Sequence, residues 1–107
     1  LSVANEIPAD IVHEDDHSLA FRDISPQAPV HILVVPKKPI PRIATASGDD
    51  AEVLGKLLIT AATVARQQGI AESGFRLVIN NGRDGGETVP HLHIHLLGGR
   101  PLDWPPG

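Results

Sequence analysis

The chain has 107 residues, of which 41% are hydrophobic, and this size predicts a single domain spanning residues 1–107. It contains no cysteine, which excludes disulfides, cysteine-ligated zinc and a cysteine nucleophile. The formal net charge is −4 without a cluster of Lys and Arg, so we expect no nucleic-acid partner, because such binding neutralises many phosphates. No apolar run approaches the ~20 residues of a membrane helix, so we expect no membrane association.

The first residue is Leu1 rather than Met, so we expect the natural N-terminus to have been removed or processed. No charged segment followed by an apolar run, typical of a secretory signal, is present. These features favour a cytoplasmic location, with an organelle as the alternative.

The first half of the chain predicts three strands. Residues 11–13 and 18–23 are expected to form short strands. Residues 30–35 are almost continuously apolar and predict a strand buried on both faces. The proline-containing segments 25–29 and 36–41 predict irregular connections, because proline cannot donate to a sheet.

A long helix is expected next. Ser47 suits the N-cap, and Asp49 and Asp50 follow in the first turn, where the helix dipole favours acids. Gly69 suits the position just after the helix. Apolar residues at three- and four-residue spacing predict the buried stripe, namely Leu54, Leu57, Leu58, Ala61, Val64 and Ala65.

The remaining elements complete an α+β pattern. Residues 75–79 predict a strand, residues 80–86 a glycine-rich loop, and residues 89–97 the last strand. Strands, one long helix and two more strands predict a mainly antiparallel sheet with the helix packed on one face.

Three of the six histidines lie within five residues. On a strand, His91, His93 and His95 would share one face, and the apolar residues between them would share the other. His13 and His17 are interpreted as ordinary surface or core histidines. The three clustered histidines have three possible interpretations. They could form an incidental polar face, hold a catalytic metal ion, or serve as acid, base and nucleophile in catalysis. The third is favoured, because residues i, i+2 and i+4 of one strand converge poorly on one ion.

The loop before these histidines suits an oxyanion. Its glycines allow backbone N–H groups to approach a phosphate closely, and Asn80 and Thr88 offer side-chain donors. An ordinary glycine-rich hairpin loop is the structural alternative.

The run from His91 to His95, followed by Leu96 and Leu97, resembles the signature of the histidine-triad (HIT) superfamily. Further segments are similar to its Hint branch, the histidine-triad nucleotide-binding proteins: residues 6–9, 23–31, 34–38 and 97–107. The resemblance implies a HIT-like fold and a homodimer. It also implies a purine nucleoside phosphoramidase, which hydrolyses the P–N bond of AMP-amine adducts such as AMP-lysine. Its partners would be purine nucleotides (AMP, GMP) or nucleoside phosphoramidates.

The resemblance also implies catalytic roles. His93 would be the nucleophile that forms a nucleotidyl-histidine intermediate, and His95 would flank the α-phosphate. His31 and His91 would form a proton relay. No cofactor and no metal are expected, since the zinc-binding cysteines of some bacterial relatives are missing.

The nucleotide contacts are likewise implied by the resemblance. Asp23 would bind the ribose hydroxyls, although a turn cap before Ser25 is its structural alternative. Phe21 and Ile24 would wall the base pocket. Asn80, Thr88 and the backbone near Val89 would contact the phosphate or the leaving group.

Two residues depart from the family pattern. Thr88 stands where Ser is usual, and Pro90 where an aromatic residue is common. These changes bear on substrate preference and rate more than on reaction class. A dinucleoside polyphosphate hydrolase, a nucleotide-binding scaffold and a metal-binding module are the alternative functions.

Overall fold

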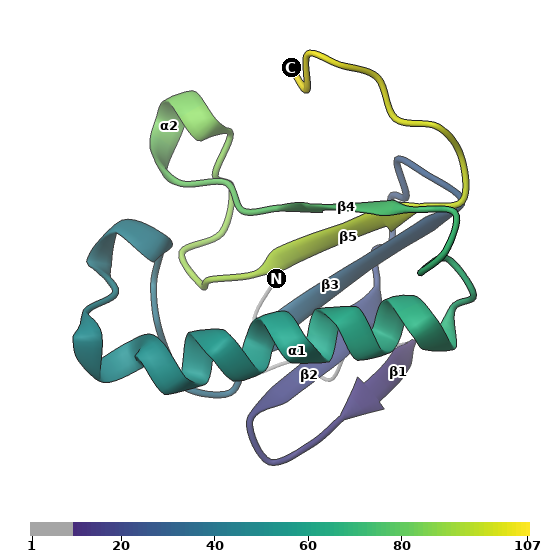
Figure 1. The fold of residues 1–107 in the computed structure, drawn as a ribbon. Coiled ribbons are helices and arrows are strands. Elements are labelled where there is room, and N and C mark those ends of the chain that lie inside the picture. The colour runs from purple at the N-terminus through teal and green to yellow at the C-terminus, as the bar shows by residue number, and fades with distance from the viewer. Residues whose placement is uncertain (1–9) are drawn as a thin grey trace.

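The computed structural model describes residues 10–107, so the Hint-like segment at residues 6–9 lies outside the described residues. One antiparallel sheet of five strands has the order β1-β2-β3-β5-β4. Its strands are β1 (Ile11–Glu14), β2 (Ser18–Arg22), β3 (Val30–Pro36), β4 (Phe75–Val78) and β5 (Ile94–Gly98). Helix α1 (Ala51–Gln67) crosses one face of this sheet (Figure 1). The predicted α+β class, with one helix packed on an antiparallel sheet, is confirmed.

The core lies between α1 and the sheet. Alternate residues of the central strands face the helix and are almost fully buried, as are the helix residues opposite them: Ala20, Ile32, Val34, Ile94, Leu96, Leu57, Ala61, Val64 and Ala65. Removing each such side chain from water stabilises the fold by roughly 1.5–3 kcal/mol for the larger residues. This packing fixes which face of β3 and β5 remains for polar side chains.

Both ends of the helical region are capped as expected. Ser47 forms a capping box with Asp50, although it caps the short 3₁₀ turn η2 (Gly48–Asp50), which leads directly into α1. Gly69 has a φ of 74°. The Gly69 N–H donates to the Arg66 carbonyl at 3.0 Å and the Ile70 N–H to the Ala65 carbonyl at 3.1 Å, which is a Schellman motif.

The helix stripe needs one correction. Leu58 was expected in the core, but it is 49% exposed. Thr60 is buried instead, because its hydroxyl makes a hydrogen bond of 3.0 Å with the Ser18 hydroxyl of β2. A threonine with a satisfied hydroxyl can face a sheet, and apolar spacing alone does not reveal that partner.

The last strand also begins later than expected. β5 starts at Ile94, so His91 and His93 precede the strand and only His95 lies on it. The partner strand β3 ends at Pro36, which cannot donate, and the Leu92 N–H donates instead to the Ile40 carbonyl at 2.7 Å. The burial alternation nevertheless continues upstream, with Leu92 buried and His91 and His93 half-buried.

The glycine-rich loop contains a helical turn that the sequence did not predict. α2 (Gly82–Gly85) is one turn long and ends at Gly86, whose φ is 81°. A short 3₁₀ turn, η1 (Ile43–Thr45), lies in the connection from β3 to α1. Within residues 10–107, no helix is both long and apolar enough to cross a membrane.

Candidate active site

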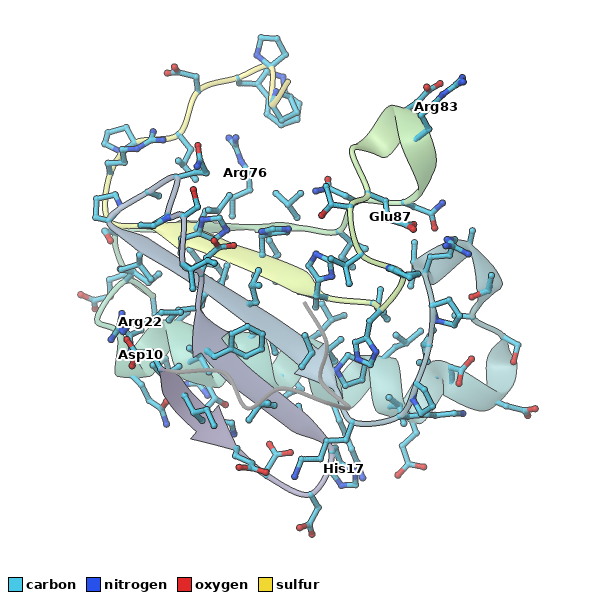
Figure 2. All side chains as sticks on the ribbon, turned by 180° about the vertical axis from the view of Figure 1, so that it is seen from behind. Asp10, His17, Arg22, Arg76, Arg83 and Glu87 are labelled. Carbon is cyan, nitrogen blue, oxygen red and sulfur yellow. The ribbon has the colours of Figure 1, made fainter. Side chains whose placement is uncertain are left out.

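By strand alternation, His31 and His95 lie on the sheet face opposite α1, with Leu33 and Phe21. Figure 2 views the sheet from that side. Leu33 of β3 pairs with His95 of β5, and His95 pairs with Val78 of β4, so the three lie in one row across the sheet. Phe21 pairs with Leu33 from the other side and extends this row. Strand alternation therefore places an imidazole in the middle of an otherwise apolar row.

A hydrogen-bonded pair of histidines forms the inner part of the site. His31 of β3 is 6% exposed, and its Nε2 lies 2.8 Å from Nδ1 of His95. The Gln27 N–H donates to Nδ1 of His31 at 3.0 Å. We therefore assign the His31 proton to Nε2, from which it is donated to His95, so that His95 carries its own proton on Nε2.

His93 lies beside this pair, and within residues 10–107 only one of its ring nitrogens makes a hydrogen bond. Its ring centroid is 5.0 Å from that of His95. Nδ1 of His93 lies 2.7 Å from the His91 carbonyl, which can only accept, so His93 carries its proton on Nδ1. In the neutral ring, Nε2 of His93 therefore has an unshared electron pair.

His91 contacts the cluster through its backbone carbonyl, which accepts the hydrogen bond from His93. Its ring Nε2–H donates to the Pro36 carbonyl at 3.1 Å. In the part of the chain that the structure describes, no hydrogen bond joins the His91 ring to His31, His93 or His95. The structure thus brings His31, His93 and His95 together and directs the His91 ring elsewhere.

Burial and neighbouring charges keep the inner histidines neutral. Burial, assisted by the charges of His93 and His31 and opposed by Asp23, lowers the pKa of His95 to about 4. Burial also lowers the pKa of His31, against the opposing effect of Asp23. At neutral pH the pair can therefore share a proton along its hydrogen bond without carrying a net charge.

Asp23 adjoins the inner pair and also caps a turn. One carboxylate oxygen lies 3.5 Å from Nε2 of His31, and the other accepts the Ser25 N–H at 2.8 Å. The turn-cap alternative is therefore present together with a carboxylate beside the histidines. A carboxylate at this position can accept hydrogen bonds from hydroxyl groups of a ligand.

Among residues 10–107, one group has donor atoms close enough together to hold a metal ion. Ligand atoms of Asp23, His31 and His95 all lie within 4.8 Å of one another. However, Nε2 of His31 must be protonated while Nδ1 accepts from the Gln27 N–H, so it offers no lone pair to a metal. The hydrogen bonding of this group fits a proton relay better than a metal site.

The predicted phosphate-contact residues lie in the loop between β4 and β5. Within residues 10–107, neither the Thr88 hydroxyl nor the Asn80 side chain makes a hydrogen bond, and neither do the N–H groups of Thr88 and Val89. Thr88 is exposed, and Asn80 and Val89 are half-buried. The loop therefore presents several donors that a bound anion could use.

The two predicted base-pocket residues are placed very differently. Phe21 is 3% exposed and packs with Leu19, Leu33 and Val35 on the face away from α1. Ile24 is 98% exposed. An aromatic ring laid over Ile24 would remove its apolar surface from water.

Sequence reasoning missed two residues that brace this loop, Arg42 and Glu87. The Arg42 guanidinium donates to both carboxylate oxygens of Glu87, at 2.9 Å each. The two residues are 45 positions apart, and neither has a local pattern that distinguishes it from surface charges. The sequence likewise predicted Gln27 only as part of a proline-containing connection, although its N–H donates to the His31 ring.

A wide surface groove lies away from His31, His91, His93 and His95. It has a volume of about 750 Å³ and runs between α1 and the turn joining β1 to β2, with Leu58, Ile59 and Lys56 among its lining residues. His17, which lines the groove, lies at the opposite end of the molecule from Glu87 (Figure 2). This groove is therefore separate from the histidine cluster.

One covering helix, a five-stranded antiparallel sheet and the His91, His93, His95 alternation define the histidine-triad class of proteins. Comparison with known proteins agrees: residues 4–102 match the HIT domain family. A protein of Escherichia coli K12 named purine nucleoside phosphoramidase is 53% identical over 100 residues, 94% of this chain and 84% of that protein. An uncharacterised HIT-like protein of Synechococcus elongatus is 60% identical over 105 residues, 98% of this chain and 91% of that protein.

A solved structure supports the same assignment. The crystal structure of a HIT family hydrolase from Legionella pneumophila superposes with a TM-score of 0.92 at 52% identity, covering 94% of this chain and 90% of that one. The chain therefore belongs to the HIT domain family. The predicted family, the HIT-like fold and the hydrolase class are confirmed.

Proposed function

We propose that this protein hydrolyses the P–N bond of purine nucleoside 5′-phosphoramidates, such as AMP-lysine, through a nucleotidyl-histidine intermediate on His93. The observation that carries the proposal is the hydrogen bond from His93 Nδ1 to the His91 carbonyl, which leaves Nε2 available as a nucleophile. The relative from Escherichia coli, named purine nucleoside phosphoramidase, supports the substrate class.

The reaction would proceed in two displacements. Nε2 of His93 attacks the α-phosphorus, the P–N bond breaks, and the amine leaves with a proton. Water then attacks the same phosphorus, the bond to Nε2 breaks, and AMP is released. Water thus supplies the proton gained by the amine and the oxygen gained by phosphorus, and the enzyme is regenerated.

The neighbouring residues would stabilise these steps. The neutral His95 would donate a hydrogen bond from its Nε2–H to a phosphate oxygen, with His31 behind it as the other member of the relay. The His91 carbonyl would stabilise the positive ring of the intermediate through Nδ1 of His93. The donors at Asn80, Thr88 and Val89, which make no hydrogen bond within residues 10–107, would hold the phosphate oxygens.

The nucleoside would lie along the edge of the same site. Asp23 would accept hydrogen bonds from the ribose hydroxyls, since its carboxylate is still partly exposed beside His31. The purine of AMP or GMP would cover Ile24, and Phe21 would support the pocket from the sheet.

A turnover assay tests the proposal. Wild-type protein should release AMP from an adenosine 5′-phosphoramidate of an alkylamine, and His93→Ala should lose ~10³-fold or more in kcat. His17→Ala is the matched control, because His17 is exposed and lies far from the loop that carries the donors.

A diadenosine polyphosphate serves as the comparison substrate. Faster turnover of this compound would replace the phosphoramidase proposal with a dinucleoside polyphosphate hydrolase. AMP binding without turnover of either compound would favour a nucleotide-binding scaffold.

We also propose that the protein forms a homodimer, as the HIT resemblance implies. Leu58 and Ile59 on the outer side of α1 are 49% and 67% exposed, and Trp104 in the C-terminal tail is 80% exposed. β4 is an edge strand, and its first residue, Phe75, is 37% exposed. Large apolar side chains and an open sheet edge both favour contact with another protein surface.

A further inference from the structure

The loop that carries the donors is held in place by one largely buried carboxylate, that of Glu87. The Glu87 side chain is only 12% exposed. One of its oxygens accepts the Arg42 Nε–H at 2.9 Å and the Gly82 N–H at 3.0 Å, and the other accepts from the Arg42 guanidinium at 2.9 Å. The Glu87 N–H also donates to the Gly82 carbonyl at 3.0 Å, so the turn of α2 is closed at its base.

Two further hydrogen bonds tie the same loop to the connection that contains Arg42. The Leu92 N–H donates to the Ile40 carbonyl at 2.7 Å, and the Ala44 N–H donates to the Asn81 side chain at 2.8 Å. Residues 40–44 therefore run antiparallel to the loop, with Arg42 and Glu87 at the middle contact. Thr88 and Val89 follow Glu87 directly, so its position sets theirs.

Arg42 and Glu87 both stay charged over a wide pH range. The hydrogen bond from Arg42 and that from the Gly82 N–H lower the pKa of Glu87 to about 2, and the charge of His93 contributes to the same shift. The Glu87 hydrogen bond raises the pKa of Arg42.

From this arrangement we propose that Arg42 and Glu87 form a positioning clamp that holds the Thr88 and Val89 donors against the phosphate bound at His93. The inference rests on the proposed function and concerns residues that would not touch the substrate themselves. A displacement of about 1 Å in a positioned group can cost about 10²-fold in rate, so a clamp on the donor loop would act mainly on kcat.

Paired substitutions test the clamp. Glu87→Gln places an amide NH₂ against the Arg42 guanidinium, and Arg42→Gln leaves the carboxylate with fewer donors. Each single variant should lower kcat for the adenosine phosphoramidate by ~10–100-fold while KM changes less than ~3-fold. The double variant R42Q/E87Q restores a matched donor and acceptor, so its kcat should return to within ~3-fold of the wild type.

The same turn provides a matched control pair. Arg83 and Asp84 form an ion pair whose side chains are each 94% exposed, and Arg83 projects from α2 into solvent (Figure 2). The double variant R83Q/D84N removes a charge pair from α2 without touching the clamp, and its kcat should equal that of the wild type. Thermal unfolding of every variant shows that the protein assayed is folded.

The outcomes separate the clamp from the proposed function. Folded single variants with wild-type kcat would overturn the clamp, as would a double variant as slow as the single ones. If the single variants do not fold, the kcat of the double variant R42Q/E87Q still tests the clamp. The clamp requires that variant to fold and to be nearly as active as the wild type. Inactivity of the wild type would instead overturn the proposed function.

Discussion

Hydrogen bonding fixes the position of the proton on three of the site's histidine rings. The Gln27 N–H makes His31 a donor to His95, and the His91 carbonyl makes His93 protonated on Nδ1. Three neighbouring imidazoles thus acquire different chemical properties from contacts that are mostly with the backbone. Burial lowers the pKa of both His31 and His95, so we expect both rings to be neutral at neutral pH, and His95 to stay neutral well below the pH at which an ordinary histidine titrates.

This expectation can be measured by NMR titration of the histidine rings. His95 should titrate with a pKa of about 4, whereas a histidine in an unfolded chain has a pKa of about 6.5. Between these values the unfolded chain binds more protons than the folded protein, so the free energy of unfolding should fall as the pH is lowered from 7 to 5. His95→Asn, which cannot take up that proton, should show a smaller fall. A His95 midpoint near 6.5 would contradict the prediction.

At the scale of the elements, the end of α1 depends on one backbone conformation. Gly69 adopts a φ of 74°, and its Schellman hydrogen bonds direct the chain from the helix toward β4. A Cβ at this position would meet no atom within 4 Å, so a side chain there is disfavoured only by the backbone conformation.

Substitution at Gly69 should therefore follow backbone preference rather than side-chain size. Gly69→Ala should lower the free energy of unfolding by about 1–2 kcal/mol, because left-handed geometry is unfavourable for residues with a Cβ. Gly69→Asn should cost less, since asparagine adopts this conformation more readily. Chemical denaturation of both variants measures the difference, and equal losses would show that the conformation is not the cause.

At the scale of the whole molecule, one side of α1 is buried against the sheet and the other side exposes apolar residues to solvent. One side packs Leu57, Ala61 and Val64 on the sheet, and the other leaves Leu58 and Ile59 in solvent beside the groove. Exposed aliphatic side chains on a helix favour a partner surface, and a second copy of the chain is the partner proposed above.

Sedimentation velocity tests the dimer. The wild type should sediment as a dimer at micromolar concentration, and Ile59→Glu should shift it toward a monomer, because a charge would be buried without a partner. Arg83→Glu is the control, since it introduces a glutamate, with an even larger change in net charge, at an exposed position on α2. A monomeric wild type would rule out the dimer, and an unchanged Ile59→Glu dimer would place the interface elsewhere.

The amino-acid sequence by itself determined the fold class, the strands, the long helix and its caps. These features depend on local periodicity and on turn residues such as Ser47 and Gly69, which act within a few positions. The cluster His91, His93 and His95 was also visible in the sequence, because three histidines at alternate positions have few structural explanations.

Only the tertiary structure decided how those histidines are used. The start of β5 at Ile94 depends on where β3 ends, and the His31–His95 pair joins residues 64 positions apart. The contact of Arg42 with Glu87 spans 45 positions, and the exposure of Leu58 depends on Thr60 having a partner on β2. Contacts between distant segments leave no periodic pattern in a single sequence, so the proton positions and the brace of the donor loop became visible only in the folded chain.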